Sequence, residues 1–168
     1  MNLINNALVC RIELQLLADL TARALRQPAP RLWTKPNAEA LRCYAEFTRQ
    51  HLQGSADEAV LQRLTHETYR MGTLLRRLLR PRRRADVERL ATRLYRNIGI
   101  RLTFTDATHL CFVRCYFSRH YTPAICLAAS TLDEGILRGI SGQPASQLRF
   151  TQRITQGCAC CKATFDKR

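Results

Sequence analysis

The sequence contains little lysine, little acid and no long apolar run. Of its 27 basic residues only Lys35, Lys162 and Lys167 are lysines, and 13 acidic residues leave a formal charge of +14. The apolar runs are far shorter than the roughly 20 residues that a membrane-spanning helix needs, so we expect no membrane span. No internal repeat or low-complexity tract is present. These absences leave a basic, globular protein as the expected class.

The start of the chain also lacks the features of a secretory signal peptide. The segment MNLINNALVCRIELQLL has no basic residue before its apolar part and no small-residue cleavage site, and we interpret it as a helix. A cytoplasmic, reducing location is therefore expected. There, the eight cysteines would serve as thiols or metal ligands rather than as a disulfide framework.

Apolar residues at helical spacing predict a helical scaffold over residues 1–99. We expect helices at 4–26, from Asn37 to Leu52, from a capping box at Ser55–Glu58 to Arg80, and from Asp86 to Asn97. The predicted inward faces include Leu8, Ile12 and Leu78. Trp33, the single tryptophan, is expected to fill the edge of the core.

After Gly99 the hydrophobic period changes from 3.6 to 2, which predicts strands. They are expected at 101–105, 109–117, 148–155 and 158–165, with a helix opened by Thr122-Pro123 between the second and third. The predicted fold is a single α+β domain, 1–168. In it, a layer of about four helices packs on a small antiparallel sheet with one inserted helix (β-β-α-β-β), and residues 100–168 form a cysteine-rich part.

The segment from Arg76 to Arg101 holds ten arginines and two acids. Its candidate anion-binding side chains are Arg80, Arg82, Arg83, Arg84, Arg89, Arg93 and Arg96. Guanidinium groups pair with phosphate, so nucleic acid, an anionic surface or an acidic partner could bind here. A solvated helix face explains the same pattern, and the segment has no helix-turn-helix or zinc-finger signature and no aromatic stacking pair.

Six cysteines lie between His109 and Phe165. Strict alternation would place Cys111 and Cys115 on one face of their strand, about 13 Å apart, which is too far for one metal ion. The C-x-x-C segment Cys158–Cys161 could hold zinc or iron together with Cys115, Cys126 or His120. Packing as small apolar side chains is the alternative for each cysteine.

The helix after Pro123 carries a second candidate site. Cys126 lies one turn from its N-terminus, where the helix dipole favours a thiolate, and Asp133 follows on the same face. His120 precedes the helix by a short loop. A site with Cys126 as nucleophile, His120 as base and Asp133 positioning water is therefore possible, with burial of Cys126 and solvation of Asp133 as the alternative.

The segments HLCFVRCYF, PAICLAASTLDEGILRG and LRFTQRITQGCACCKATF resemble, in this order, the bacterial L-2-amino-thiazoline-4-carboxylic acid hydrolase family. In that comparison Cys115 matches the family's strand cysteine and Cys126 and Asp133 match its helix. Arg149 or Arg153, Gly157 and Cys160 or Cys161 match its terminal hairpin. The upstream LRCYAEFTRQHL is similar to the helix that precedes that domain.

The stretches YRNIGIRL and DEGILRG are also similar to vinyl-reductase-like ligand-binding domains and, more remotely, to TRAPP-type subunits. The first resemblance implies a hydrolase that opens a small cyclic C–N bond, with Arg149 or Arg153 holding a substrate carboxylate and Cys115 nearby. The second implies a non-catalytic module that binds a small molecule or a metal. An adaptor that binds nucleic acid or an acidic partner through the arginine segment is the third hypothesis.

Overall fold

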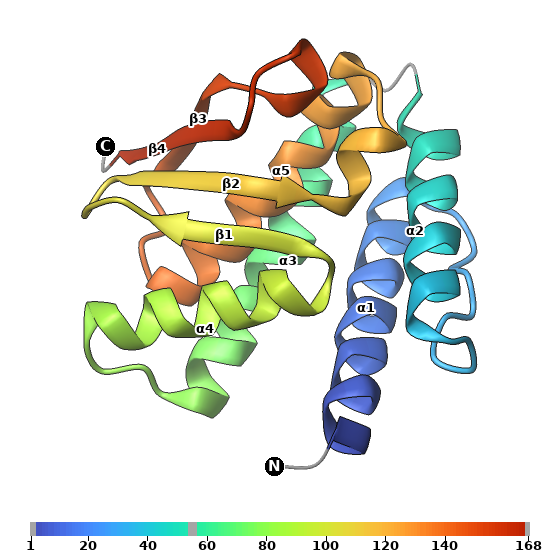
Figure 1. The fold of residues 1–168 in the computed structure, drawn as a ribbon, viewed down its shortest axis with the longest axis horizontal. Helices are drawn as coiled ribbons and strands as arrows, with labels where there is room; N and C mark the ends of the chain where they lie inside the picture. The colour runs from blue at the N-terminus through green and yellow to red at the C-terminus, as the bar shows by residue number, and fades with distance from the viewer. Residues whose placement is uncertain (1–2, 54–56, 167–168) are drawn as a thin grey trace.

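The computed structural model describes residues 3–53 and 57–166 and has the predicted α+β class. Its elements are α1 (Leu3–Leu25), α2 (Asn37–Leu52), α3 (Glu58–Leu79), α4 (Arg84–Asn97), β1 (Ile100–Phe104), β2 (His109–Cys115), η1 (Tyr116–Arg119), α5 (Pro123–Ser141), β3 (Gln147–Gln152), η2 (Ile154–Gln156) and β4 (Cys161–Asp166). Figure 1 shows the sheet lying across α5 and α3, with α4 beside β1 and with α1 and α2 side by side at one end.

Within the described residues the sheet has four antiparallel strands in the order β1-β2-β4-β3. The last strand, β4, thus enters between β2 and β3. Its register places Ala163 opposite Leu110 and Cys161 opposite Phe112, and all four side chains are buried. One face of β2 and β4 therefore contributes to the core.

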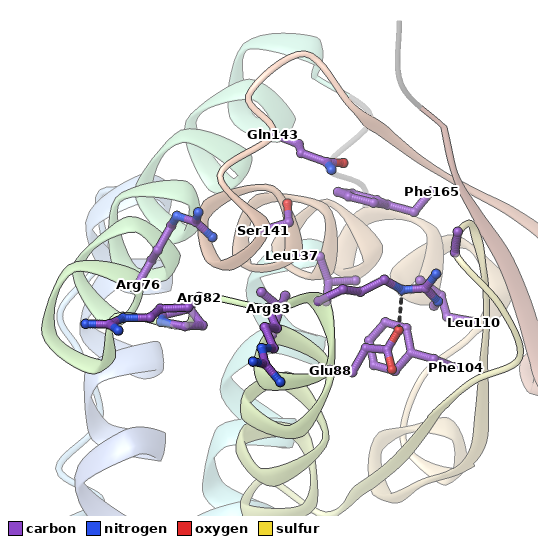
Figure 2. Close-up of a pocket in the computed structure, with 14 residues that line it drawn as sticks. Arg76, Arg82, Arg83, Glu88, Phe104, Leu110, Leu137, Ser141, Gln143 and Phe165 are labelled. Carbon is purple, nitrogen blue, oxygen red and sulfur yellow. Dashed lines mark hydrogen bonds and ion pairs between the residues drawn. The ribbon is translucent and has the colours of Figure 1, made fainter.

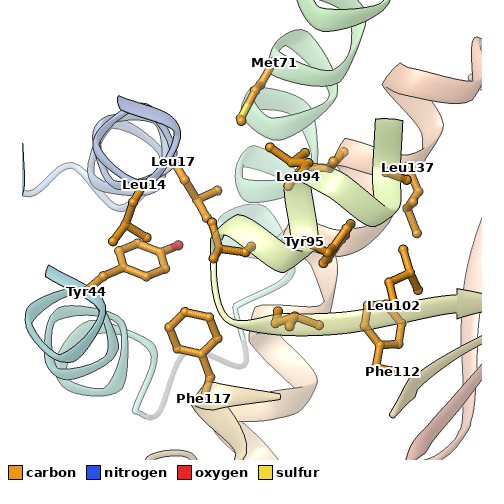
Figure 3. Packing of buried hydrophobic residues seen from close by; sticks show 14 of the residues in the cluster. Leu14, Leu17, Tyr44, Met71, Leu94, Tyr95, Leu102, Phe112, Phe117 and Leu137 are labelled. Atoms are coloured by element: carbon orange, nitrogen blue, oxygen red, sulfur yellow. The ribbon is translucent and has the colours of Figure 1, made fainter. Parts of the chain in front are cut away.

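The core lies between this inner face of the sheet and the helices. Figure 3 shows Tyr95 of α4 against Leu102 and Phe112 of the sheet, and Tyr44 of α2 near Phe117. The rings of Tyr95 and Phe112 meet edge to face at 5.5 Å between centroids. Burial of these apolar surfaces is the main force that holds the helices on the sheet.

Helices α3 and α5 pack at backbone distance because glycines line their contact. A Cβ atom added to Gly135 would overlap the Thr68 hydroxyl, and one added to Gly139 would overlap the Tyr69 carbonyl oxygen. Gly72 of α3 is equally tight against the carbonyl oxygen of Ile136. This contact fixes α5, the helix that carries Cys126 and Asp133.

Local signals explain where helices begin and end. The Thr122 hydroxyl caps α5 by accepting a hydrogen bond from the Ile125 N–H at 3.3 Å, and Pro123 is its first residue. Asp57 caps α3 and accepts from the Ala59 N–H at 2.9 Å. Ser55, with which the predicted capping box begins, lies outside the described residues. Arg80 closes α3 in the left-handed region, immediately before Pro81.

Several predicted core positions were wrong. Leu8 and Ile12 of α1 are 50% and 56% exposed, because this end of α1 extends beyond the sheet (Figure 1). Leu78 lies on the last turn of α3 and is 68% exposed, and Trp33 on the α1–α2 connection is 60% exposed. In the part of the chain that the structure describes, no helix has both the length and the apolar character needed to cross a membrane.

The predicted alternation of β2 was wrong at a β-bulge, and this changes the direction of the Cys115 side chain. Leu102 pairs with Phe112 while Arg101 pairs with Arg114, so Val113 is an extra residue in β2. After this bulge the alternation reverses. Cys111 lies on the outer face and Cys115 on the inner face, whereas strict alternation had placed both on one face.

The terminal hairpin is also shorter than predicted. The β3 strand ends at Gln152 rather than Thr155, after a register shift beyond Phe150, and β4 begins at Cys161 rather than Cys158. In the same way β2 ends at Cys115, and η1 takes up the last two residues of the predicted strand. These breaks turn Arg153 out of the alternating strand pattern and into the protein interior.

Candidate functional site

Five side chains lie within range of one another's charges under the Cys115 end of the sheet: Cys115, Cys126, Asp133, Arg153 and Cys161, here called the thiol–carboxylate cluster. The charges of Asp133 and Cys126 both act on the thiols of Cys115 and Cys161, and the charge of Arg153 acts on Asp133. The members come from β2, α5, the β3–η2 junction and β4. The fold thus joins residues that the sequence separates by up to 46 positions.

Each member reaches the cluster for a local reason. Cys126 and Asp133 are seven residues apart on α5 and so share one face of the helix. The bulge in β2 turns Cys115 inward, and the pairing of Cys161 with Phe112 places Cys161 on the inner face.

The Asp133 carboxylate is the most perturbed acid of the cluster. Burial raises its pKa to about 7, although the hydrogen bond from Tyr95 and the charge of Arg153 partly oppose this rise. The Tyr95 hydroxyl donates to Asp133 Oδ1 at 3.0 Å, and Tyr95 is fully buried. The residue as a whole is half-buried, but its carboxylate is enclosed by protein. Near neutral pH, Asp133 is therefore present in both protonation states.

Arg153 supplies the positive charge of the cluster. The residue is 8% exposed, and its guanidinium lies over the Phe150 ring, 4.4 Å from the centroid. Its Nη1 atom is buried, and no hydrogen-bond acceptor for it occurs among residues 3–53 and 57–166. A buried guanidinium N–H without an acceptor costs free energy that a bound carboxylate would recover.

The structure distinguishes the two arginines that the sequence left as alternatives. Arg149 is exposed on β3, and its Nη2 donates to Gln147 Oε1 at 3.2 Å. Only Arg153 of these two lies with Asp133. The register shift after Phe150 explains the difference, because it ends the alternation that Arg149 follows.

Two thiols of the cluster, those of Cys115 and Cys161, are held in the protonated form. Burial, with a smaller contribution from the charge of Asp133, raises the pKa of Cys115 to about 12. Burial also raises the pKa of Cys161, whose sulfur accepts a hydrogen bond from the Ile154 N–H at 3.2 Å. Cys115 and Cys161 are therefore poor nucleophiles at neutral pH.

His120 does not join the cluster. Its ring packs on Tyr116, 5.1 Å between centroids, and its Nε2 accepts a hydrogen bond from Arg119 Nε at 3.3 Å. No hydrogen bond links His120 to Cys126 in the described part of the chain. Helix η1 begins at Tyr116, where the sequence predicted strand, and sets the direction of the loop that carries His120. The predicted cysteine–histidine pair is therefore not formed in this structure.

The candidate metal ligands are likewise separated. Among the described residues no group of three or more His, Cys, Asp or Glu side chains could hold a metal ion. The C-x-x-C segment divides, because Cys161 is buried while the Cys160 thiol hydrogen-bonds to Cys111 on the outer face of the sheet. Cys158 lies on the turn before β4 and is half-buried. This arrangement offers no centre that would bind zinc or iron.

A groove of about 960 Å³ opens beside the cluster. Cys115 and Ile154 line it, and Ile154 directly follows Arg153. Four arginines also line the groove: Arg96, Arg101, Arg114 and Arg119. A small anion that approached the cluster from this side would pass a positively charged surface.

The arginine segment does not form one continuous stripe. Arg80 ends α3, Arg89 forms an ion pair with Asp86, and Arg93 is exposed on α4. Arg96 belongs to the groove, whereas Arg82, Arg83 and Arg84 line a different pocket. Four of the seven candidate residues therefore lie at two separate pockets, and the other three line neither of them.

Sequence reasoning missed Tyr95 as part of the site. A signal was present, because Tyr95 follows Ala91 by four residues on the apolar face of α4. A tyrosine on a buried face needs a partner for its hydroxyl, and Asp133 is that partner.

A scan of the chain against models of protein families finds no match, and no curated protein matches it.

Proposed function

We propose that this protein is a small-molecule hydrolase that opens a cyclic C–N bond in a substrate bearing a carboxylate, of the thiazoline-carboxylate type. The observation that carries the proposal is the buried, unpartnered Nη1 of Arg153 beside the Asp133 carboxylate. A cation without an acceptor next to a carboxylic acid of near-neutral pKa suits a substrate that has one anionic group and one hydrolysable bond.

Arg153 would bind the substrate carboxylate through its free N–H group. Stacking on Phe150 holds the guanidinium plane in one orientation. Asp133, oriented by Tyr95, would take a proton from water as the water oxygen bonds to the amidine-like ring carbon. It would then give this proton to the ring nitrogen, which loses its double bond to the carbon. Asp133 would next take the remaining hydroxyl proton as the C=O bond forms and the C–N bond breaks, and would pass it to the leaving nitrogen, which becomes an amine and leaves Asp133 ionised.

Water rather than Cys126 is the nucleophile in this proposal. Cys126 shares a face of α5 with Asp133, but no hydrogen-bonded histidine activates it within the described residues. We therefore expect Cys126→Ala to keep most of the activity. A covalent mechanism would instead abolish turnover in this variant.

Ring opening of 2-amino-thiazoline-4-carboxylate by the purified protein tests the proposal. Mass spectrometry would detect a product heavier by one water. We expect kcat to rise with pH through about 7, the pKa of Asp133. Asp133→Asn should lower kcat by about 10²–10⁴-fold, as loss of a general base does.

The matched pair Arg153→Gln and Arg149→Gln tests the carboxylate contact. Arg153→Gln should raise KM by about tenfold or more, because it removes a charge-assisted hydrogen bond. Arg149→Gln removes the same charge from the exposed side of β3 and should change little. The proposal is wrong if thiazoline and related cyclic carboxylates remain intact, or if both arginine variants behave alike.

A non-catalytic binding module is the second candidate, and the enclosure of the cluster favours it. Among the described residues no histidine is hydrogen-bonded to Cys126, and burial keeps the thiols of Cys115 and Cys161 protonated, so little acid–base chemistry besides that of Asp133 is placed there. In that case calorimetry would show carboxylate binding that depends on Arg153, while the compound is recovered unchanged after prolonged incubation.

A further inference from the structure

A second pocket lies at the opposite end of the inner sheet face, beside Leu110. Its volume is about 280 Å³. Its floor is apolar and consists of Val87, Phe104, Leu110, Leu137 and Phe165. Figure 2 shows Leu110, Leu137, Phe104 and Phe165 around the pocket, with arginine side chains on the other side.

The rim of this pocket is basic. Four arginines line it (Arg76, Arg82, Arg83 and Arg84), and Glu88 is the one acid among its lining residues. Glu88 is already engaged, since its Oε1 accepts from Arg84 Nε at 2.6 Å. The rim therefore keeps an excess of positive charge close to an apolar floor.

Backbone geometry holds this rim in place. Helix α3 ends before Pro81, and the carboxylate of Asp86 accepts hydrogen bonds from the backbone N–H groups of Arg82 and Arg83 at 3.2 and 2.9 Å. This turn is therefore fixed by its main chain, while the exposed side chains of both arginines remain at the pocket.

Arg76 is held from the other side. Its Nη1 donates to the Ile140 carbonyl oxygen at 2.9 Å, and its guanidinium lies where a Cβ on residue 142 would be. Gly142, which also has a positive φ of 69°, therefore leaves room for it. The remaining N–H groups of Arg76 lie at the pocket rim.

We propose that this pocket binds a small amphipathic anion, with its apolar group on the floor and one carboxylate or phosphate against the arginine rim. Guanidinium groups bind both of these anions through paired hydrogen bonds. The volume is at the small end of the roughly 300–1,000 Å³ of known ligand pockets, so the apolar group is a short acyl chain or a single ring. The ligand is a free monomer, because the floor lies between α4, α5 and the sheet and two of its residues, Leu110 and Leu137, are buried.

This inference is independent of the proposed hydrolase. The pocket and the thiol–carboxylate cluster lie at opposite ends of β2, and they share no lining residue. Either proposal can therefore be refuted without affecting the other.

Calorimetric titration of the full chain with four probes tests the pocket. Octanoate and octyl phosphate supply both an apolar group and an anion, octanol supplies the apolar group alone, and inorganic phosphate supplies the anion alone. We expect one equivalent of octanoate or octyl phosphate to bind, at least about tenfold more tightly than either partial probe. Equal affinity for inorganic phosphate and octyl phosphate would overturn the proposal.

Two pairs of variants locate the binding. Arg83→Gln removes a charge from the rim and should weaken octanoate binding by about tenfold. Arg93→Gln removes the same charge from the exposed face of α4 and should leave octanoate binding unchanged. Ala107→Phe adds a ring to an exposed position that lines the pocket and should block it. Thr105→Phe adds the same ring beside it, outside the pocket, and should leave binding unchanged.

Anionic lipid vesicles test whether the ligand is a free monomer or a lipid in a membrane. The proposal predicts that octanoate binds below its micellar concentration and that vesicles of phosphatidylglycerol do not compete with it. Vesicle binding without monomer binding would overturn it. So would loss of octanoate affinity in both members of either variant pair.

Discussion

The two ends of the inner sheet face differ in the kind of group that they hold. At the Cys115 end, thiols, a carboxylate and a guanidinium lie together, and burial raises the pKa values of Cys115 and Asp133. At the Leu110 end the floor is apolar and the charged groups stand on an exposed rim. The same strand, β2, connects both ends over seven residues.

The two ends show that the cost of an arginine to stability depends on whether its side chain is exposed or enclosed. An exposed arginine keeps its hydration until a ligand arrives, so the Leu110 end costs little stability. An enclosed arginine whose Nη1 has no acceptor lowers the free energy of unfolding until a ligand pairs with it. The Cys115 end therefore costs more stability than the Leu110 end and should discriminate more strongly between ligands. The predictions below test this contrast.

The largest expected effect concerns the reactivity of Cys115. A pKa of about 12 instead of the ordinary 9.0 leaves about a thousandfold less thiolate at pH 8. We expect iodoacetamide to modify Cys115 that much more slowly than it modifies glutathione, as followed by peptide mass spectrometry. In denaturant the rates should become similar. Fast labelling of Cys115 in the folded protein would show that this end is open.

The second prediction concerns pH-dependent stability. The pKa of Asp133 is about 7 in the folded protein, against an ordinary value of 3.8, so the folded state binds this proton more tightly than the unfolded state. The contribution of Asp133 to the free energy of unfolding therefore falls as pH rises from about 4 to about 7.

Replacement of Asp133 by asparagine removes this dependence. The difference in the free energy of unfolding, variant minus wild type, should rise by about 2–4 kcal/mol from pH 4 to pH 8, as measured by urea unfolding. Asp106→Asn is the matched control, because that exposed carboxylate has its pKa lowered, chiefly by backbone N–H groups of Thr108 and His109. The control should instead change the pH dependence of stability at acid pH. If the difference between Asp133→Asn and wild type did not vary with pH, the carboxylate of Asp133 would not be enclosed.

Local sequence signals predicted the helices well because their causes are local. Thr122-Pro123 opens α5 and Pro81 follows the end of α3, as capping and proline chemistry require. Helix α2 begins at Asn37 as predicted, but it follows Pro36 and has no side-chain cap. The α+β class followed from the change of period after Gly99. Each of these inferences depends on a few neighbouring residues.

The site was harder to predict because it depends on irregular pairing. One extra residue, Val113, reverses the face of Cys115, and the break after Gln152 buries Arg153. The choice between Arg149 and Arg153 could not be made from alternation, which places both on one face. Helical spacing places Asp133 and Cys126 on one face of α5, but the residues near them come from strands and from Tyr95.

The third prediction concerns α5, which contributes to both ends. Gly139→Ala would force a Cβ against the Tyr69 carbonyl oxygen and should lower the free energy of unfolding by about 1–3 kcal/mol. Both the pH dependence of Asp133 and octanoate binding should weaken together. Ser130→Ala, on an exposed part of the same helix, is the control and should change stability by less than about 0.5 kcal/mol. An effect on one end alone would show that α5 does not couple them.

The smallest effect is expected at the basic rim. Arg83→Gln should change the free energy of unfolding by less than about 0.5 kcal/mol, because its exposed guanidinium stays hydrated. Arg76→Gln should cost about 1 kcal/mol, since it removes the hydrogen bond to Ile140. Urea unfolding at one pH compares the two variants. If Arg83→Gln proved as costly as Arg76→Gln, the rim would be part of the folded framework, and the contrast between a hydrated end and an enclosed end would be lost.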